Sequence, residues 1–136
     1  MATEQIPPGF APHFRKSPLT DPWEPLFSKR DDDRFLLGLR VRQPHCNSRG
    51  LAHGGLISAL ADNAMGLACV LAAGREGAGG VTVSLSLDFL GAVSLEQWLE
   101  VAASPMKVGG GLAFAQAEIT ADSTLAGRAS AVFKMR

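Results

Sequence analysis

One stretch of the chain, residues 47–62, brings together residue types that could act on a carbonyl compound. Gly54 and Gly55 stand where a loop is predicted to become a helix, and glycine lets a ligand approach the backbone closely. The first N–H groups of a helix have no partner inside the helix, so they can polarise a carbonyl or hold a negative charge. This segment therefore offers hydrogen-bond donors for an electrophile.

Asp62 follows about two turns further along the same predicted helix. Its neighbours Leu60, Ala61 and Ala64 are apolar, and desolvation opposes the charge of a carboxylate placed among apolar groups. A carboxylate can serve as a nucleophile or as a general base on water. Because acyl transfer needs both a polarised carbonyl and such a group, we favour a functional role for Asp62 over that of a solvated surface carboxylate.

A single long helical pattern, residues 54–73, must position these groups. Its apolar residues recur three or four positions apart, at Leu56, Leu60, Ala64, Leu67 and Leu71. A second face gathers small and polar residues, namely Gly55, Ser58, Asp62 and Gly66. Since the helix is apolar around most of its circumference, we expect other structure to wrap it.

Alternation of apolar and polar residues predicts five strands, over residues 34–42, 81–89, 97–103, 112–120 and 126–135. No helix separates the last four strands, so they should form an antiparallel meander. Residues 1–33 hold most of the prolines and are expected to be an N-terminal extension, with a possible short helix over residues 22–27 after the N-cap Asp21. The expected fold class is α+β, with one domain over residues 34–136.

Composition narrows the possible partners. The chain has 13 basic and 13 acidic residues, so bulk charge gives no reason to expect nucleic acid or a membrane surface as a partner. Two cysteines and an N-terminus without a signal-peptide pattern fit a reducing compartment, so we expect a cytoplasmic protein in which Cys46 and Cys69 are inert. No pair among His13, His45 and His53 has zinc-ligand spacing, so no metal site is predicted.

The pattern N-x-x-G-x-x-H-G-G-x-x-x-x-L-x-D, which runs from Asn47 to Asp62, resembles that of hotdog-fold acyl-CoA thioesterases of the phenylacetate-degradation (PaaI-like) family. Residues 80–83, 89–90 and 112–115 are also similar, and the likeness covers roughly residues 34–136. The resemblance implies one long central helix wrapped by a curved antiparallel sheet of about five to six strands. It also implies a homodimer with active sites at the dimer interface, which assembles into a tetramer.

The same resemblance implies roles for individual residues. The Gly54 N–H and the Asn47 side chain would polarise the thioester carbonyl, and Asp62 from the other chain would be the nucleophile or general base. Thr82 matches a position where a hydroxyl orients the attacking water. Supporting roles are expected for His53 and Gly55, and substrate contacts for Ser58, Ser84 and Lys107. No cofactor is expected, since CoA is part of the substrate.

Some features leave alternatives open. Many members of the family have a basic residue in the turn that corresponds to residues 109–111, where only Lys107 lies nearby, and Ala92 replaces a common proline. Trp23 and Phe27 are expected to cover the core, with a wall of the acyl pocket as the alternative.

Two other functions compete with thioester hydrolysis. Hydratases and dehydratases of the same fold use a histidine paired with a carboxylate, and His53 has no obvious carboxylate partner in the sequence. A non-catalytic acyl-CoA sensor is the third hypothesis, and the sequence has neither a helix-turn-helix segment nor a basic arm to favour it.

Overall fold

The helix predicted from hydrophobic periodicity forms as α1, Gly54–Ala72. Ten of its residues are buried, and it packs against the sheet along the faces of several strands. Length and composition alone would also suit a membrane span, but 56% of its most apolar stretch is buried inside the fold. Its apolar character is therefore that of a core helix, as expected from the sequence.

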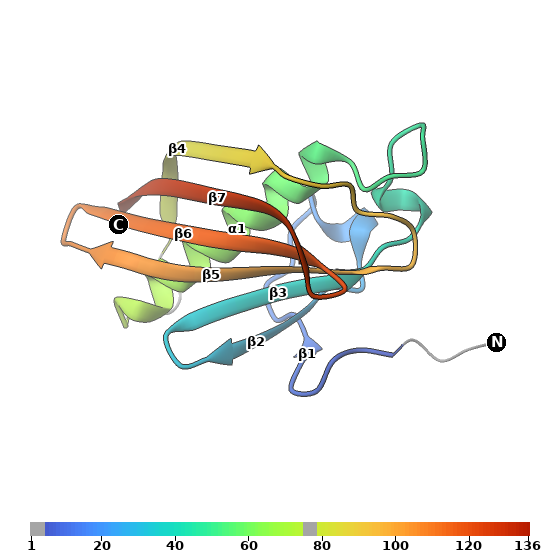
Figure 1. Ribbon diagram of the computed structural model, residues 1–136. Coiled ribbons are helices and arrows are strands. Elements are labelled where there is room, and N and C mark those ends of the chain that lie inside the picture. The colour runs from blue at the N-terminus through green and yellow to red at the C-terminus, as the bar shows by residue number, and fades with distance from the viewer. Residues whose placement is uncertain (1–4, 75–78) are drawn as a thin grey trace.

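The structure, a computed structural model, describes residues 5–74 and 79–136. Within these ranges seven strands form one antiparallel sheet in the order β1-β2-β3-β5-β6-β7-β4, and the sheet wraps around α1 (Figure 1). The strands are β1 (Ala11–Pro12), β2 (Phe27–Asp31), β3 (Arg34–Arg40), β4 (Gly80–Phe89), β5 (Trp98–Val108), β6 (Leu112–Ala121) and β7 (Thr124–Met135). The expected meander is confirmed for β5, β6 and β7, and β4 pairs with β7 at the far edge.

The two strands beyond the expected number come from the N-terminal segment. β2 forms a hairpin with β3, and β1 extends the sheet beyond β2. The short helix expected over residues 22–27 is only a 3₁₀ helix, Asp21–Trp23, and Phe27 already starts β2. Glu24 is extended, with a ψ of 148°, because the residue before a proline is disfavoured in the helical region.

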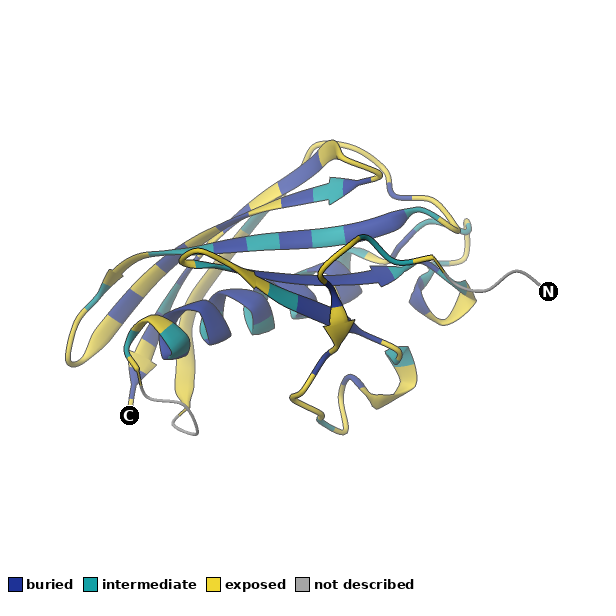
Figure 2. Ribbon diagram, turned by 90° about the horizontal axis from the view of Figure 1, so that it is seen from below, coloured by how far each residue is buried: buried dark blue, intermediate teal, exposed yellow. Residues whose placement is uncertain are grey.

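The core lies between α1 and the face of the sheet that the helix covers. Buried and exposed residues alternate along β6 and most of β7, which is visible as alternating colours in Figure 2. On β6 and β7 the inward side chains are mostly alanine, at Ala113, Ala115, Ala117, Ala129 and Ala131. On β3 and β5 they are larger, at Leu37, Leu39, Leu99 and Val101. Small side chains let the helix lie close to the sheet there, and larger ones fill the wider side.

Candidate active site

Asp62 and Thr82 lie together where α1 faces β4. The Thr82 hydroxyl donates a hydrogen bond to the Asp62 carboxylate, with 2.7 Å between Oγ1 and Oδ1. Asp62 is half-buried and Thr82 is exposed, so the pair is open to a ligand. The structure thus brings together the expected nucleophile or base and the expected water-orienting hydroxyl.

A β-bulge in β4 sets the direction of Thr82. Thr82 and Ser84 pair with consecutive residues of β7, Phe133 and Val132, which leaves Val83 unpaired. Consecutive strand residues face opposite sides, so Thr82 faces α1 together with the buried Phe133, and Ser84 faces the other side. Without the bulge both residues would face the same way.

Ser84 and Lys107 therefore lie away from Asp62, on the opposite face of the sheet. Lys107 pairs with Phe114, Phe114 with Val132, and Val132 with Ser84, so these residues form one row across the outer face of the sheet. This face lies opposite the one that α1 covers. The substrate contacts expected of Ser84 and Lys107 would have to be made on that outer face.

The start of α1 is built as the sequence suggested. His53 is the N-cap, and its Nδ1 accepts a hydrogen bond of 2.8 Å from the Gly55 N–H. The Ser58 hydroxyl donates to the Gly54 carbonyl at 2.7 Å, so its proton is used inside the helix. A Cβ atom at Gly54 would lie 3.4 Å from the Phe89 ring, in ordinary van der Waals contact, so this ring borders the start of the helix.

The loop before α1 orients the Asn47 side chain. Its Oδ1 accepts hydrogen bonds from the Arg49 N–H at 2.9 Å and the Leu51 N–H at 3.1 Å. Two backbone donors at one atom identify that atom as the oxygen, so the amide Nδ2 is left as the free donor with respect to the residues that the structure describes. The donor expected for a carbonyl is therefore present, on a loop fixed by its own hydrogen bonds.

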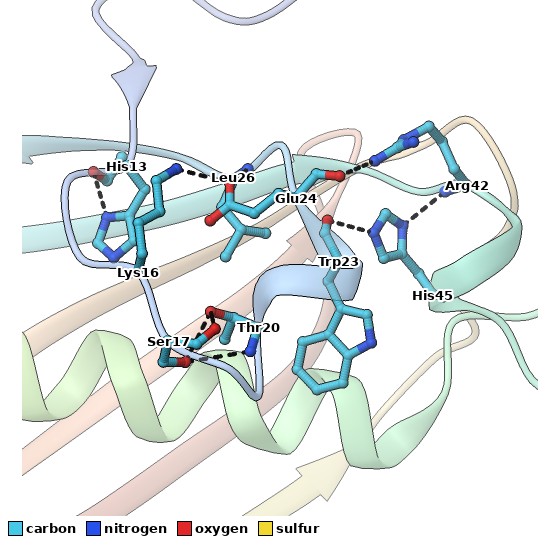
Figure 3. Close-up of polar contacts among 10 residues, drawn as sticks. His13, Lys16, Ser17, Thr20, Trp23, Glu24, Leu26, Arg42 and His45 are labelled. Atoms are coloured by element: carbon cyan, nitrogen blue, oxygen red, sulfur yellow. Dashed lines mark hydrogen bonds and ion pairs between the residues drawn. The ribbon is translucent and has the colours of Figure 1, made fainter.

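His45 is a structural residue that the sequence analysis did not single out. It is buried, its Nδ1 accepts from the Arg42 N–H at 2.9 Å, and its Nε2 is 2.9 Å from the Trp23 carbonyl oxygen (Figure 3). Its own carbonyl accepts from the His53 N–H at 2.8 Å. Because Nδ1 accepts a backbone N–H, Nε2 carries the proton, and the ring ties the N-terminal segment to the loop. No local pattern reveals a partner 22 residues away.

The N-terminal segment also reaches the candidate site, although not through Trp23 or Phe27, the two residues considered as a pocket wall. Residues 13–20, here called the strap, pass over α1 (Figure 3). A hollow of about 210 Å³ lies between the strap and the Asp62–Thr82 pair. It is lined by His13, Arg15, Ser17, Asp62, Asn63, Gly66, Leu67, Gly79, Gly80, Thr82 and Phe133.

His13 anchors the strap at the back of this hollow. Its Nδ1 is 2.9 Å from the Ser28 hydroxyl, and its N–H donates to the Leu26 carbonyl at 2.9 Å. Burial lowers the pKa of His13 from its usual 6.5, an effect that Glu24 opposes and the charges of Lys16 and Arg15 reinforce. The imidazole is therefore neutral at pH 7.

The cysteines show no sign of reactivity. Both are free thiols, and burial raises the pKa of the Cys69 thiol to about 11, so it stays protonated. Cys46 is half-buried, with its Sγ 3.4 Å from the Arg42 carbonyl oxygen. The carboxylate of Asp62 is the better candidate for a nucleophile or base.

Comparison with known proteins shows to which family the chain belongs. Residues 49–133 match the family model described as the thioesterase superfamily. A protein of Pseudomonas aeruginosa, provisionally named as an esterase, is 44% identical over 132 residues, which cover 96% of this chain and 97% of that protein. The chain belongs to the thioesterase superfamily. Membership makes it a thioester hydrolase, as the resemblance implied.

A more distant sequence relative and two solved structures are also similar to this chain. Human acyl-coenzyme A thioesterase 13 is 31% identical over 93 residues, which cover 67% of this chain and 64% of the human protein. A conserved protein of Pseudomonas aeruginosa superposes with a TM-score of 0.79, at 22% identity, covering 89% of this chain and 95% of that chain. A thioesterase of Streptococcus pneumoniae, solved with coenzyme A, gives a TM-score of 0.73 at 23% identity, covering 83% of this chain and 90% of that chain.

The phenylacetic acid degradation protein PaaI of Thermus thermophilus, solved as a point mutant, is also similar in structure. Its TM-score is 0.73 at 22% identity, covering 88% of this chain and 99% of that chain. The hotdog fold is therefore confirmed, with seven strands in place of the five to six expected.

Proposed function

We propose that the protein hydrolyses acyl-CoA thioesters and that Asp62 is the group that attacks the carbonyl or activates water. The hydrogen bond of 2.7 Å between Thr82 and Asp62 carries this proposal, because it joins a carboxylate and a hydroxyl at an open hollow. Acyl-CoA as the substrate is supported by the human relative, named as an acyl-coenzyme A thioesterase, and by the streptococcal thioesterase solved with coenzyme A.

The reaction requires a polarised carbonyl, an attacking oxygen and a leaving thiolate. In this proposal the Gly54 N–H and the Asn47 amide bind the carbonyl oxygen and stabilise the negative charge that forms there. Asp62 either attacks the carbonyl carbon or removes a proton from a water that does so. If Asp62 attacks, the C–S bond breaks, and a water molecule then hydrolyses the acyl–Asp62 anhydride, releases the free acid and supplies the proton of the CoA thiol. If Asp62 instead deprotonates the water, the C–S bond breaks and the proton on Asp62 passes to the CoA thiolate.

The Thr82 hydroxyl has a defined part in this scheme. Its proton is already donated to Oδ1 of Asp62, so its oxygen can accept a hydrogen bond from a water molecule. A water held in this way lies beside the carboxylate that would deprotonate it. This arrangement suits the role that the family resemblance implies for Thr82.

The two halves of the site belong to different chains in this proposal. Gly54 and Asp62 are eight residues apart on one helix, which separates them by about 12 Å at 1.5 Å per residue. One carbonyl group cannot contact both over that distance. A second copy of the chain can supply the missing half if its helix start approaches Asp62.

The surface around β4 supports such pairing. β4 is an edge strand, and an unpaired edge offers N–H and C=O groups to another strand. Large apolar side chains on it are exposed, at Val81, Val83, Leu85 and Phe89. We propose that a second copy pairs along β4 to form a homodimer, and further assembly into a tetramer stays a prediction.

Replacement of Asp62 tests the proposed hydrolysis. Asp62→Ala should abolish most turnover, because it removes the group that attacks or activates water, while the half-exposed position leaves the fold intact. The measurement is release of free CoA, detected with a thiol reagent, from aryl, short-chain and long-chain acyl-CoA esters.

The control is Asp88→Ala, which removes a β4 carboxylate that is paired with Arg128, at 2.9 Å, on the outer face of the sheet. Asp88→Ala should keep its turnover. Near-normal CoA release by Asp62→Ala would contradict the proposal. Incubation of the wild type with an enoyl-CoA ester is the second arm, and loss of enoyl absorbance without CoA release would point to a hydratase. His53 offers little for hydration, since the part of the chain that the structure describes holds no carboxylate hydrogen-bonded to it.

A further inference from the structure

The strap closes one side of the hollow that contains Asp62. Two of its residues, Arg15 and Ser17, line the hollow together with Asp62 and Thr82. The match to the family model begins only at residue 49, so this wall comes from a part of the chain outside the matched domain. The strap thus adds polar groups to the site from outside the matched residues 49–133.

The strap is held at both ends. His13 is 3% exposed and bonds Ser28 and Leu26, and Thr20 is 2% exposed. The Thr20 N–H donates to the Ser17 hydroxyl oxygen at 3.2 Å, which fixes the turn between them (Figure 3). The backbone at Arg15 therefore lies between two buried anchors, beside the hollow.

Arg15 is the charged residue of the strap that lines the hollow. Among its lining residues Asp62 is the one carboxylate and Arg15 the one permanent cation. Within residues 5–74 and 79–136, Arg15 makes no ion pair within 4.0 Å, whereas its neighbour Lys16 lies 3.2 Å from Glu24. The Arg15 guanidinium is free to bind an anion, and its planar donors suit a carboxylate or a phosphate.

The hollow has room for part of a substrate. Gly79 is one of its lining residues and has no side chain to fill it. Among the residues that the structure describes, no atom lies within 4 Å of a Cβ atom built at Gly79. A group attached to a carbonyl at Asp62 can therefore extend toward the strap.

We infer that Arg15 is a specificity-determining residue that binds an anionic group of the thioester substrate in this hollow. The inference rests on the proposed function, because the hollow becomes a substrate site only if Asp62 acts on a thioester. The anion has two possible sources, a phosphate of CoA or a carboxylate at the far end of the acyl group. Both sources present oxygen atoms to the same guanidinium.

Three thioesters distinguish these sources: hexanoyl-CoA, adipoyl-CoA and S-hexanoylpantetheine, which has neither phosphate nor carboxylate. If Arg15 binds a CoA phosphate, Arg15→Gln lowers kcat/KM about tenfold for both CoA esters and leaves the pantetheine ester unchanged. If Arg15 binds an acyl carboxylate, only adipoyl-CoA is affected. Arg15→Lys should restore part of the loss, since it keeps the charge but not the planar donors.

The matched control is Lys16→Gln, which removes the adjacent cation that pairs with Glu24 and does not line the hollow. It should leave all three values of kcat/KM within twofold of the wild type. The inference is overturned if Arg15→Gln also stays within twofold for every ester. It is equally overturned if all three esters lose the same factor, because the uncharged ester then reports a structural defect.

Binding gives a second readout that does not depend on turnover. Dissociation constants for the three esters are measured by calorimetry on Asp62→Asn, with and without Arg15→Gln, and the same selective weakening is expected. If the wild-type protein releases CoA from no ester, the proposed hydrolysis fails while these constants still decide the role of Arg15. Equal dissociation constants with and without Arg15→Gln would overturn the inferred role of Arg15.

Discussion

At the scale of single residues, the candidate site is defined by which hydrogen bonds are already made. The Asn47 Oδ1 is occupied by two backbone N–H groups, so the amide can only present donors to a ligand. The His53 Nδ1 already accepts a hydrogen bond from the Gly55 N–H, and the Thr82 hydroxyl already donates its proton to Asp62. Groups fixed in this way need little rearrangement when charge develops on a substrate, which is the condition for strong electrostatic stabilisation.

Asn47→Asp isolates the donor of Asn47 from its role in the loop. Aspartate keeps the oxygen that accepts from Arg49 and Leu51 but replaces the donating Nδ2 by a second oxygen. Turnover should fall by about 10²-fold or more, as expected for loss of one of two oxyanion donors. The measurement is kcat for CoA release, together with thermal unfolding to show that the loop and fold persist.

Asn47→Ala serves as the comparison, because it removes both the donor and the acceptor. If Asn47→Asp turned over at the wild-type rate, the carbonyl oxygen would have to be held by other groups.

Much of this residue-scale picture could be predicted, and the failures have physical causes. Asp62 stood out because a lone carboxylate on an otherwise apolar helix is costly to desolvate. Ser84 was expected to contact substrate from the family resemblance alone, and the bulge at Val83, which turns Ser84 to the face opposite Thr82, has no signal in the sequence. His13 was not singled out, since its partner Ser28 lies 15 residues away.

At the scale of elements, the strap is the part of the structure that local patterns could not place. Its prolines ruled out a long helix, but they did not show that residues 11–31 would add two strands and a wall to the site. By contrast, α1 and the strands β5 to β7 follow from hydrophobic periodicity, because each buries one apolar face. The alternation in β4 also predicted a strand, although most of its apolar side chains are exposed. The position of the strap is determined by contacts between segments that are far apart in the sequence. The helix and the strands of the meander can instead be predicted from hydrophobic periodicity within each segment.

The buried His13 should make the stability of the strap depend on pH. Burial lowers the pKa of His13 in the folded state, so the unfolded chain, with an ordinary pKa of 6.5, binds a proton more readily. This stability is fully present above pH 6.5 and declines as the pH falls through 6.5 toward the lower folded pKa. The free energy of unfolding, measured in urea between about pH 5 and 8, should therefore decrease toward acid.

The variant His13→Gln has no group that titrates in this range at position 13. It should be less stable at neutral pH, because the buried contact with Ser28 is altered, and its free energy of unfolding should vary less with pH. His53→Gln is the control, since His53 is exposed and lies outside the strap. A pH dependence in His13→Gln equal to that of the wild type would show that other groups are responsible.

At the scale of the whole molecule, the length of α1 is the reason why the proposed site needs two chains. The polarising helix start and the carboxylate lie on the same rigid helix, about 12 Å apart by the rise of an α-helix. No side-chain movement brings them to one carbonyl. In the proposed dimer, a two-fold arrangement of chains along β4 would form two equivalent sites, each with the helix start of one chain and Asp62 of the other.

Mixing two inactive variants tests this arrangement directly. In a dimer of Asp62→Ala with Asn47→Asp, one site contains both replacements, and the other combines the intact Asn47 of the first chain with the intact Asp62 of the second. Random reassociation of equal amounts makes half the dimers mixed, each with one working site, so about a quarter of the wild-type rate of CoA release should return. If each site lay within one chain, every site in the mixture would carry a replacement and no activity would return. The two variants are therefore unfolded and refolded together, with each refolded separately as the control.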